Sequence, residues 1–140
     1  MRKMLVAYDE SRAAPRQLER AVELAKAFEA KVIVTSVAPV LHGGARGAGS
    51  LDPVDPPAHH QDELREAHAY FTEHGVDAEL VPAVGDPAPA IVKLAEDYDV
   101  DVVVVGTREP GLVERVMRHS VSREVARRVH RDLFIVHPEH

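Results

Sequence analysis

Short apolar runs alternate along this chain with longer stretches in which apolar residues recur every three or four positions. The runs are rich in β-branched residues, so each predicts a buried β-strand. The longer stretches place their apolar residues on one face, which predicts amphipathic α-helices. Strands are expected at residues 4–8, 31–37, 77–81, 100–105 and 133–136, and helices at about 12–29, 60–74, 87–98 and from near 120. This alternation predicts an α/β fold, an open doubly wound parallel sheet with helices on both faces.

The helix ends have recognisable signals, and the apolar stripes identify the side chains expected to face the core. Asp86 precedes Pro87 at one helix start, where its side chain is expected to cap free backbone N–H groups. Gly75 is expected to end another helix in a left-handed conformation. The inward-facing residues are predicted to be Leu18, Ala21, Val22, Ala25, Phe28, Leu64, Ala67, His68, Phe71, Ile91, Leu94, Ala95, Tyr98, Val121, Val125, Ala126 and Val129.

One long segment shows neither pattern. Residues 41–57 hold half of the chain's eight glycines together with three prolines, a composition that predicts a flexible loop. The remaining elements fit a single domain over residues 1–140, which is large enough to bury one core without disulfides or metals.

Composition narrows the environment and the partners. The chain has no cysteine, which excludes disulfides and thiolate chemistry, and its first apolar run is too short for a signal peptide or a membrane span. We therefore expect a cytoplasmic protein. The formal net charge of −6 gives no general attraction to nucleic acid or anionic lipid, so neither is expected as a partner. No metal site is expected either, because His42, His59 and His60 fall in or beside the predicted loop without a carboxylate or cysteine at useful spacing.

The ends of the predicted strands suggest where a ligand would bind. In open parallel sheets, ligands lie beyond the carboxyl ends of the strands. That rule selects Asp9, Val37, Gly85, Gly106 and the loop that leads to Ser122. The loop begins at a glycine after four valines, and Ser120 and Ser122 stand where a helix N-terminus attracts anions.

Two doubly wound alternatives fit poorly. A response-regulator receiver needs an aspartate after the third strand and a lysine after the fifth, but those places hold Val81-Pro82 and His137-Pro138. A flavodoxin needs a phosphate loop after the first strand, and the segment 9–12, Asp-Glu-Ser-Arg, is too acidic for a phosphate monoester.

A third alternative rests on six segments spread over the whole chain, MLVAYDES, AVELAKAF, GDPAPAIVKLAED, DVDVVVVGTRE, HSVSREVARRV and LFIVHP. In this combination the chain resembles the universal stress protein family. The resemblance implies a five-stranded sheet of order 3-2-1-4-5. It also implies a homodimer formed through the last strand, with Leu133, Phe134, Ile135 and Val136 at the interface.

The same resemblance implies an adenine-nucleotide site at the strand ends. Asp9 would contact the adenosine part, Val37 and Val105 would pack against the base, and Gly106 and Arg108 would begin a phosphate loop. The complete predicted site consists of Ala7, Tyr8, Asp9, Val37, Val105, Gly106, Arg108, Glu109, His119, Ser120, Val121 and Ser122.

Three glycines of the family pattern are replaced in this sequence. The family's phosphate motif, Gly-x2-Gly-x9-Gly-Ser/Thr, begins at Gly106, so its second and third glycines fall on Glu109 and His119. The glycine common after the first-strand aspartate is Glu10. Glycine lets a backbone approach a phosphate and take positive φ, and a carboxylate adds repulsion.

Three functions therefore remain open. The first is a homodimeric stress-response or signalling module whose nucleotide site is degenerate and which acts through an unknown protein partner. The second is a retained adenine-nucleotide sensor for AMP, cAMP or ATP, with Mg²⁺ needed only if ATP binds. The third, a weak ATPase, ranks last because no motif supplies an activating base or a metal pair.

Overall fold

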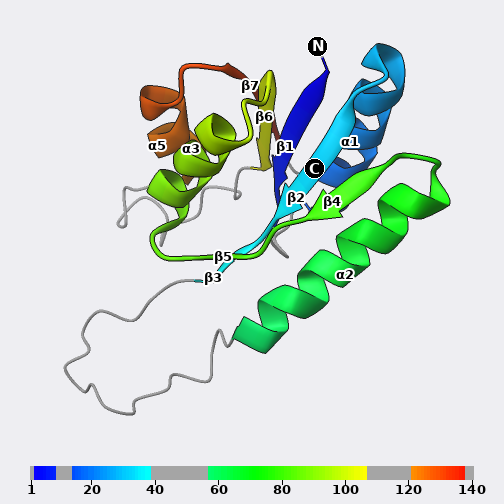
Figure 1. Cartoon of the computed structure of the whole chain (residues 1–140), viewed down its shortest axis with the longest axis horizontal. Helices are drawn as coiled ribbons and strands as arrows, with labels where there is room; N and C mark the ends of the chain where they lie inside the picture. The colour runs from blue at the N-terminus through cyan, green and yellow to red at the C-terminus, as the bar shows by residue number, and fades with distance from the viewer. Residues whose placement is uncertain (1, 9–13, 39–56, 107–120, 138–140) are drawn as a thin grey trace.

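The computed structural model describes residues 2–8, 14–38, 57–106 and 121–137 (Figure 1). Strands and helices alternate along these ranges, as the apolar pattern predicts, except at two places where one strand follows another without a helix between them. In chain order the elements are β1 (Lys3–Ala7), α1 (Ala14–Phe28), β2 (Lys31–Thr35), β3 (Val37–Ala38), α2 (Pro57–Glu73), β4 (Ala78–Leu80), β5 (Ala83–Val84), α3 (Pro87–Asp97), β6 (Val102–Gly106), α5 (Val121–Arg128) and β7 (Asp132–Val136). Residues 41–56 of the loop predicted at 41–57 lie outside the described residues, and Pro57 is the first residue of α2.

The main sheet confirms the predicted topology. Its five strands are parallel and follow the order β4-β2-β1-β6-β7, which is 3-2-1-4-5 when these strands are counted along the chain. Two very short strands were not predicted: β3 and β5 pair with each other in a separate two-stranded sheet. The predicted strand at 31–37 is therefore interrupted at Ser36, and only its first part belongs to the main sheet.

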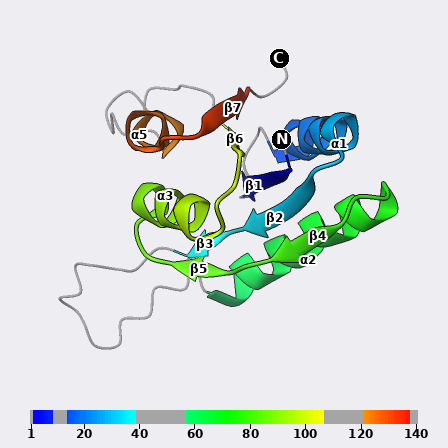
Figure 2. The same cartoon turned by 45° about the horizontal axis from the view of Figure 1, so that its top comes forward.

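Helices cover both faces of the sheet, with α1 and α2 on one side and α3 and α5 on the other (Figure 2). The first face buries a cluster that includes Met4, Val6, Leu18 and Phe71, and the second face buries a cluster that includes Leu5. Because side chains alternate along a strand, neighbouring residues of β1 contribute to different clusters. Two covered faces explain why the strands read as continuous apolar runs.

Ten of the predicted inward-facing side chains are buried, four are half-buried (His68, Leu94, Tyr98 and Val129), and Phe28 and Ala126 are exposed. The side chain of Val121 lies outside the described residues. Phe28 is 49% exposed. It is the last residue of α1, displaced along and around the helix from the stripe centred on Ala25. Ala126 is also exposed, because it lies about 100° around α5 from the buried Val125. Tyr98 is half-buried against the second cluster and follows the last residue of α3 instead of lying within the helix.

The predicted helix ends are confirmed in position but not in every bond. Gly75 has φ +76°, the left-handed conformation expected after α2. Asp86 occupies the N-cap position of α3 with Pro87 following it, yet its side chain makes no capping hydrogen bond. The predicted Asp86 cap is thus wrong. Since Pro87 has no N–H to satisfy, the first turn of α3 requires less from a cap.

An aspartate fastens the start of β1 to the chain just before β6. Asp101 Oδ2 accepts hydrogen bonds from the backbone N–H of Arg2 at 2.7 Å and of Lys3 at 3.0 Å. The backbone is also joined directly, because the N–H of Asp101 donates to the carbonyl oxygen of Lys3 at 2.9 Å. The two N–H groups stabilise the ionised carboxylate and lower the pKa of Asp101.

Asp101→Asn is expected to reduce the stability of the fold in a pH-dependent manner. A carboxyl whose folded pKa lies below its unfolded value stabilises the folded state at pH values above the unfolded pKa. That contribution is lost as the pH falls through the folded pKa. Urea unfolding of wild type and Asp101→Asn should therefore give midpoints that differ at neutral pH and converge under acid conditions. A difference that stayed constant with pH would contradict the role of the ionised carboxylate.

Candidate functional site

The carboxyl ends of three strands bring small and branched side chains together on the face covered by α3 and α5. Ala7 ends β1 and lies in register between Thr35 of β2 and Val105 of β6. Ala7 and Val105 both pack in the second cluster, together with Val37 at the start of β3. The structure therefore brings Val37 and Val105, the two residues predicted to pack against a base, together with Ala7, another residue of the predicted site.

Tyr8 is placed differently. Its backbone N–H donates to the carbonyl oxygen of Thr35 at 2.8 Å, so the chain remains beside β2 for one residue after β1 ends. Its side chain is buried in the first cluster, on the face of α1 and α2. The Tyr8 ring and the side chains of Ala7 and Val105 consequently lie on opposite faces of the sheet.

The predicted phosphate loop is described only at its two ends. Gly106 ends β6 in register with Val136 of β7, and the next described residue, Val121, begins α5 close to the expected helix start. Outside the described residues lie Asp9, Arg108, Glu109, His119 and Ser120, and with them the side chains of Val121 and Ser122.

The sequence interpretation missed buried polar groups beneath and beside these strand ends. Gln17 and Thr35 are fully buried, and the Ser36 hydroxyl donates to the buried Glu63 carboxylate at 2.8 Å. The Ser36–Glu63 bond ties the end of β2 to α2. The only sequence signal for Gln17 is a polar residue directly before the apolar stripe of α1, a position that otherwise suggests a solvated side chain.

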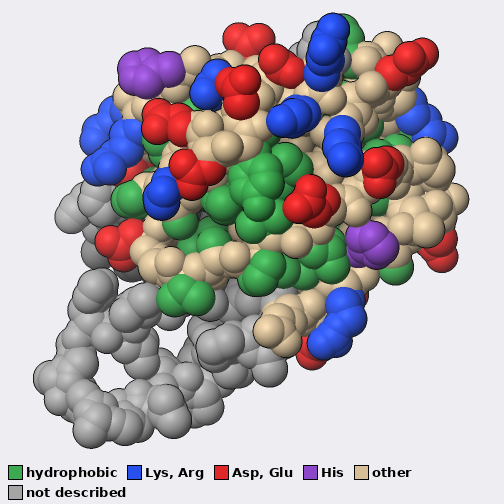
Figure 3. All heavy atoms as spheres, viewed as in Figure 1, with side chains coloured by type: hydrophobic (Ala, Val, Ile, Leu, Met, Phe, Trp, Pro, Cys, Tyr) green, Lys and Arg blue, Asp and Glu red, His purple; other side chains and the backbone are tan. Residues whose placement is uncertain are grey.

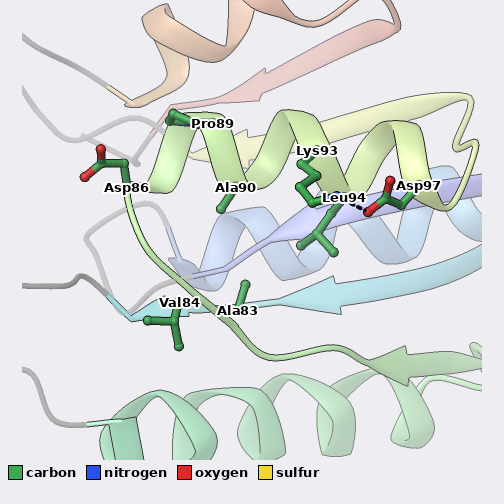
Figure 4. A pocket seen from close by; sticks show the side chains of 8 residues that line it. All are labelled: Ala83, Val84, Asp86, Pro89, Ala90, Lys93, Leu94 and Asp97. Carbon is green, nitrogen blue, oxygen red and sulfur yellow. Dashed lines mark hydrogen bonds and ion pairs between the residues drawn. The ribbon is translucent and has the colours of Figure 1, made fainter.

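A groove of about 400 Å³ lies between β5 and α3, and none of the predicted site residues lines it (Figure 4). Ala83, Val84 and Leu94 give it an apolar lining. At one end, Lys93 Nζ pairs with Asp97 Oδ2 at 3.0 Å across one turn of α3. Both charged groups are largely exposed, so the pair contributes little stability.

The face drawn in Figure 3 mixes acidic and basic side chains around a central apolar area, which lies between α3 and β2 as oriented in Figure 1. Within the described ranges, no three or more His, Asp or Glu side chains are grouped so that they could hold a metal ion. No helix in the same ranges is long and apolar enough to cross a membrane.

Comparison with known proteins agrees with this fold and with the resemblance seen in the sequence. The universal stress protein family matches residues 1–137. Universal stress protein YxiE of Bacillus subtilis (strain 168) is 32% identical, with 89% of this chain and 90% of YxiE covered. Universal stress protein Rv1636 of Mycobacterium tuberculosis (strain H37Rv) is also 32% identical, with 96% and 94% covered.

A solved structure of a universal stress protein in complex with cAMP is similar over nearly the whole chain. It has a TM-score of 0.75 and 29% sequence identity, and the match covers 99% of this chain and 98% of the solved one. The sequence match and the structural match both extend from β1 to β7. The chain therefore belongs to the universal stress protein family.

Proposed function

We propose that this universal stress protein binds an adenine mononucleotide, AMP or cAMP, more tightly than ATP. The observation that carries the proposal is the apolar group of Ala7, Val37 and Val105 at the strand ends, in which Ala7 and Val37 are partly exposed and Val105 is buried beside them. A purine base would pack favourably against partly exposed apolar side chains of this kind. The relative with cAMP bound is 29% identical and supports the same ligand class.

The preference for a mononucleotide follows from the sequence beyond the base site. Glu109 and His119 occupy the positions of the two later motif glycines, and Arg108, Ser120 and Ser122 are retained. The retained groups suit one phosphate at the start of α5. A polyphosphate would extend further and meet the Glu109 carboxylate, which repels it. Mg²⁺ enters this proposal only together with ATP, and no catalytic step is part of it.

Isothermal titration with AMP, cAMP and ATP in the presence of Mg²⁺ tests the proposal. We expect heat of binding with AMP or cAMP and at least about tenfold weaker binding of ATP. Ala7→Leu, which enlarges the side chain at the end of β1, should abolish the signal. The matched control Ala69→Leu makes the same change at an exposed position of α2, on the other side of the sheet, and should retain it. Absence of heat with all three nucleotides would overturn nucleotide binding.

A second proposed role is a homodimeric module that acts through a protein partner, and the edge of the main sheet supports the homodimer. Among the described residues, β7 is an edge strand that pairs with β6 on one side only. Its side chains are largely apolar, and Ile135 is 37% exposed. An unpaired apolar edge is a template for pairing with a second strand. We propose that a second copy of this chain covers it.

Ile135→Lys is expected to convert the dimer to a monomer. A charged side chain at an apolar interface loses its hydration without gaining a partner, whereas in the monomer it remains in water. Sedimentation or light scattering of wild type and variant would give the two masses. Val84→Lys is the matched control, because Val84 is 66% exposed but belongs to β5 in the separate two-stranded sheet. A variant that kept the mass of a dimer would refute the β7 interface.

A further inference from the structure

A buried side-chain amide joins two strands of the main sheet at their carboxyl ends. Gln17 lies in α1 and is 1% exposed. Its Nε2 donates one hydrogen bond to the carbonyl oxygen of Ala7 at 2.7 Å and another to that of Val104 at 3.2 Å. Ala7 is the last residue of β1, and Val104 lies two residues before the end of β6. One side chain therefore connects the two adjacent strands.

These strands flank the point at which the winding of the sheet reverses. From β1 the chain passes through α1 to β2 on one side, while β6 lies on the other side of β1 and leads through α5 to β7. The helices α1 and α5 accordingly cover opposite faces (Figure 2). Where connections diverge in this way they leave a crevice beyond the strand ends, and ligands bind there. Gln17 thus joins the two strands that bound the crevice.

The surroundings of Gln17 are unfavourable for an amide. The neighbouring inward positions of α1, Leu18, Ala21 and Val22, are apolar and buried. The Oε1 of Gln17 is buried and has no hydrogen-bond partner among the described residues. A buried carbonyl oxygen without a partner loses its hydrogen bonds to water and gains none in the protein, which destabilises the folded state. Methionine would fill similar space without that loss, so the two donated bonds distinguish Gln17 from an ordinary core residue.

We propose that Gln17 is a positioning residue of the adenine-nucleotide site. Its amide sets the separation of the ends of β1 and β6, and with it the relative positions of Ala7, Val105 and Gly106 around the ligand. Gln17 itself does not contact the nucleotide. The assignment rests on the proposed nucleotide binding, and it adds a residue on the opposite face of the sheet from the base surface.

The test compares two core variants of α1. Gln17→Met removes both donated bonds and keeps an unbranched side chain of similar length, and it is expected to weaken AMP binding by about tenfold. Val22→Ala, five residues further along the same buried face, removes apolar contacts but no hydrogen bond, and it should leave the dissociation constant within about twofold. Thermal unfolding of both variants gives their stability. Amide hydrogen exchange without nucleotide should become faster in Gln17→Met at residues 6–8 and 104–106.

The possible outcomes separate this assignment from the proposed function. If wild type binds AMP and Gln17→Met binds it equally well, the role of Gln17 is wrong while nucleotide binding stands. If wild type binds no adenine nucleotide, both proposals are wrong. Affinity that falls in both variants in proportion to their loss of stability would reduce Gln17 to an ordinary core residue. If Gln17→Met does not fold, Gln17→Leu replaces it, because leucine is apolar, favours a helix and also donates neither hydrogen bond.

Discussion

Phe71→Ala is expected to lower the free energy of unfolding by about 3–5 kcal/mol. Phe71 is among the largest fully buried side chains in the described ranges, with 0% exposure, and it packs in the cluster between α2 and the sheet. Truncation leaves a cavity that the surrounding strand and helix atoms fill only partly. A chain of 140 residues has a total stability of roughly 7–21 kcal/mol, so the loss is a large share of it.

Urea unfolding followed by circular dichroism measures this loss, and the chain contains its own control. Phe28→Ala removes the same ring from α1, where the side chain is 49% exposed. It should cost less than about 1 kcal/mol, because exposed apolar surface gains little from folding. Similar losses in the two variants would mean that α1 or α2 packs differently from the structure.

The contrast between these two phenylalanines shows what an apolar stripe can predict. Both residues lie at helical spacing from apolar neighbours, so the pattern assigned both to the core. The spacing shows which face of a helix is apolar, but it does not show how far along the helix that face is covered by the sheet. Phe28 lies at the last position of α1 and remains outside the core, whereas Phe71 lies two residues before the end of α2 and is covered.

The strands were predictable for a similar physical reason. The valine run at 102–105 has no polar alternation, which requires cover on both faces, and β6 is an interior strand of a sheet with helices on both sides. The strands β3 and β5 have only two residues each, too few to show any periodicity. They pair because the chain segments that leave β2 and β4 run side by side, and the local sequence pattern carries no information about that arrangement.

The predicted site rests on one rule about the backbone. Ligands lie beyond the carboxyl ends of parallel strands, and that rule selects Val37 and Gly106 from the sequence. Gln17 could not be found in this way. Its partner Val104 is 87 residues away, and a polar residue beside an apolar stripe normally faces water. The spacing of apolar residues near a side chain therefore cannot predict that side chain's hydrogen bonds to distant parts of the sequence.

The combined substitution Glu109→Gly and His119→Gly is expected to raise the affinity for ATP by roughly ten- to hundredfold. Both residues stand at positions where the family's phosphate motif has glycine. Removing a carboxylate from within about 5 Å of a polyphosphate is worth on the order of 1–3 kcal/mol, which corresponds to this change. Two glycines also allow the backbone the positive φ and the close approach that a phosphate cradle uses.

Two comparisons test whether the gain in ATP affinity comes from residues 109 and 119: AMP against ATP, and the double variant against a matched control. AMP affinity should change much less than ATP affinity in the double variant, since a single phosphate depends mainly on the retained Arg108, Ser120 and Ser122. Glu114→Gly removes another carboxylate from the same stretch of sequence, away from the motif positions, and should leave ATP affinity nearly unchanged. Unchanged or weaker ATP binding by the double variant would show that the two lost glycines do not limit the site. An equal gain in Glu114→Gly would mean that the net charge of the segment, and not a cradle at residues 109 and 119, governs its affinity for phosphate.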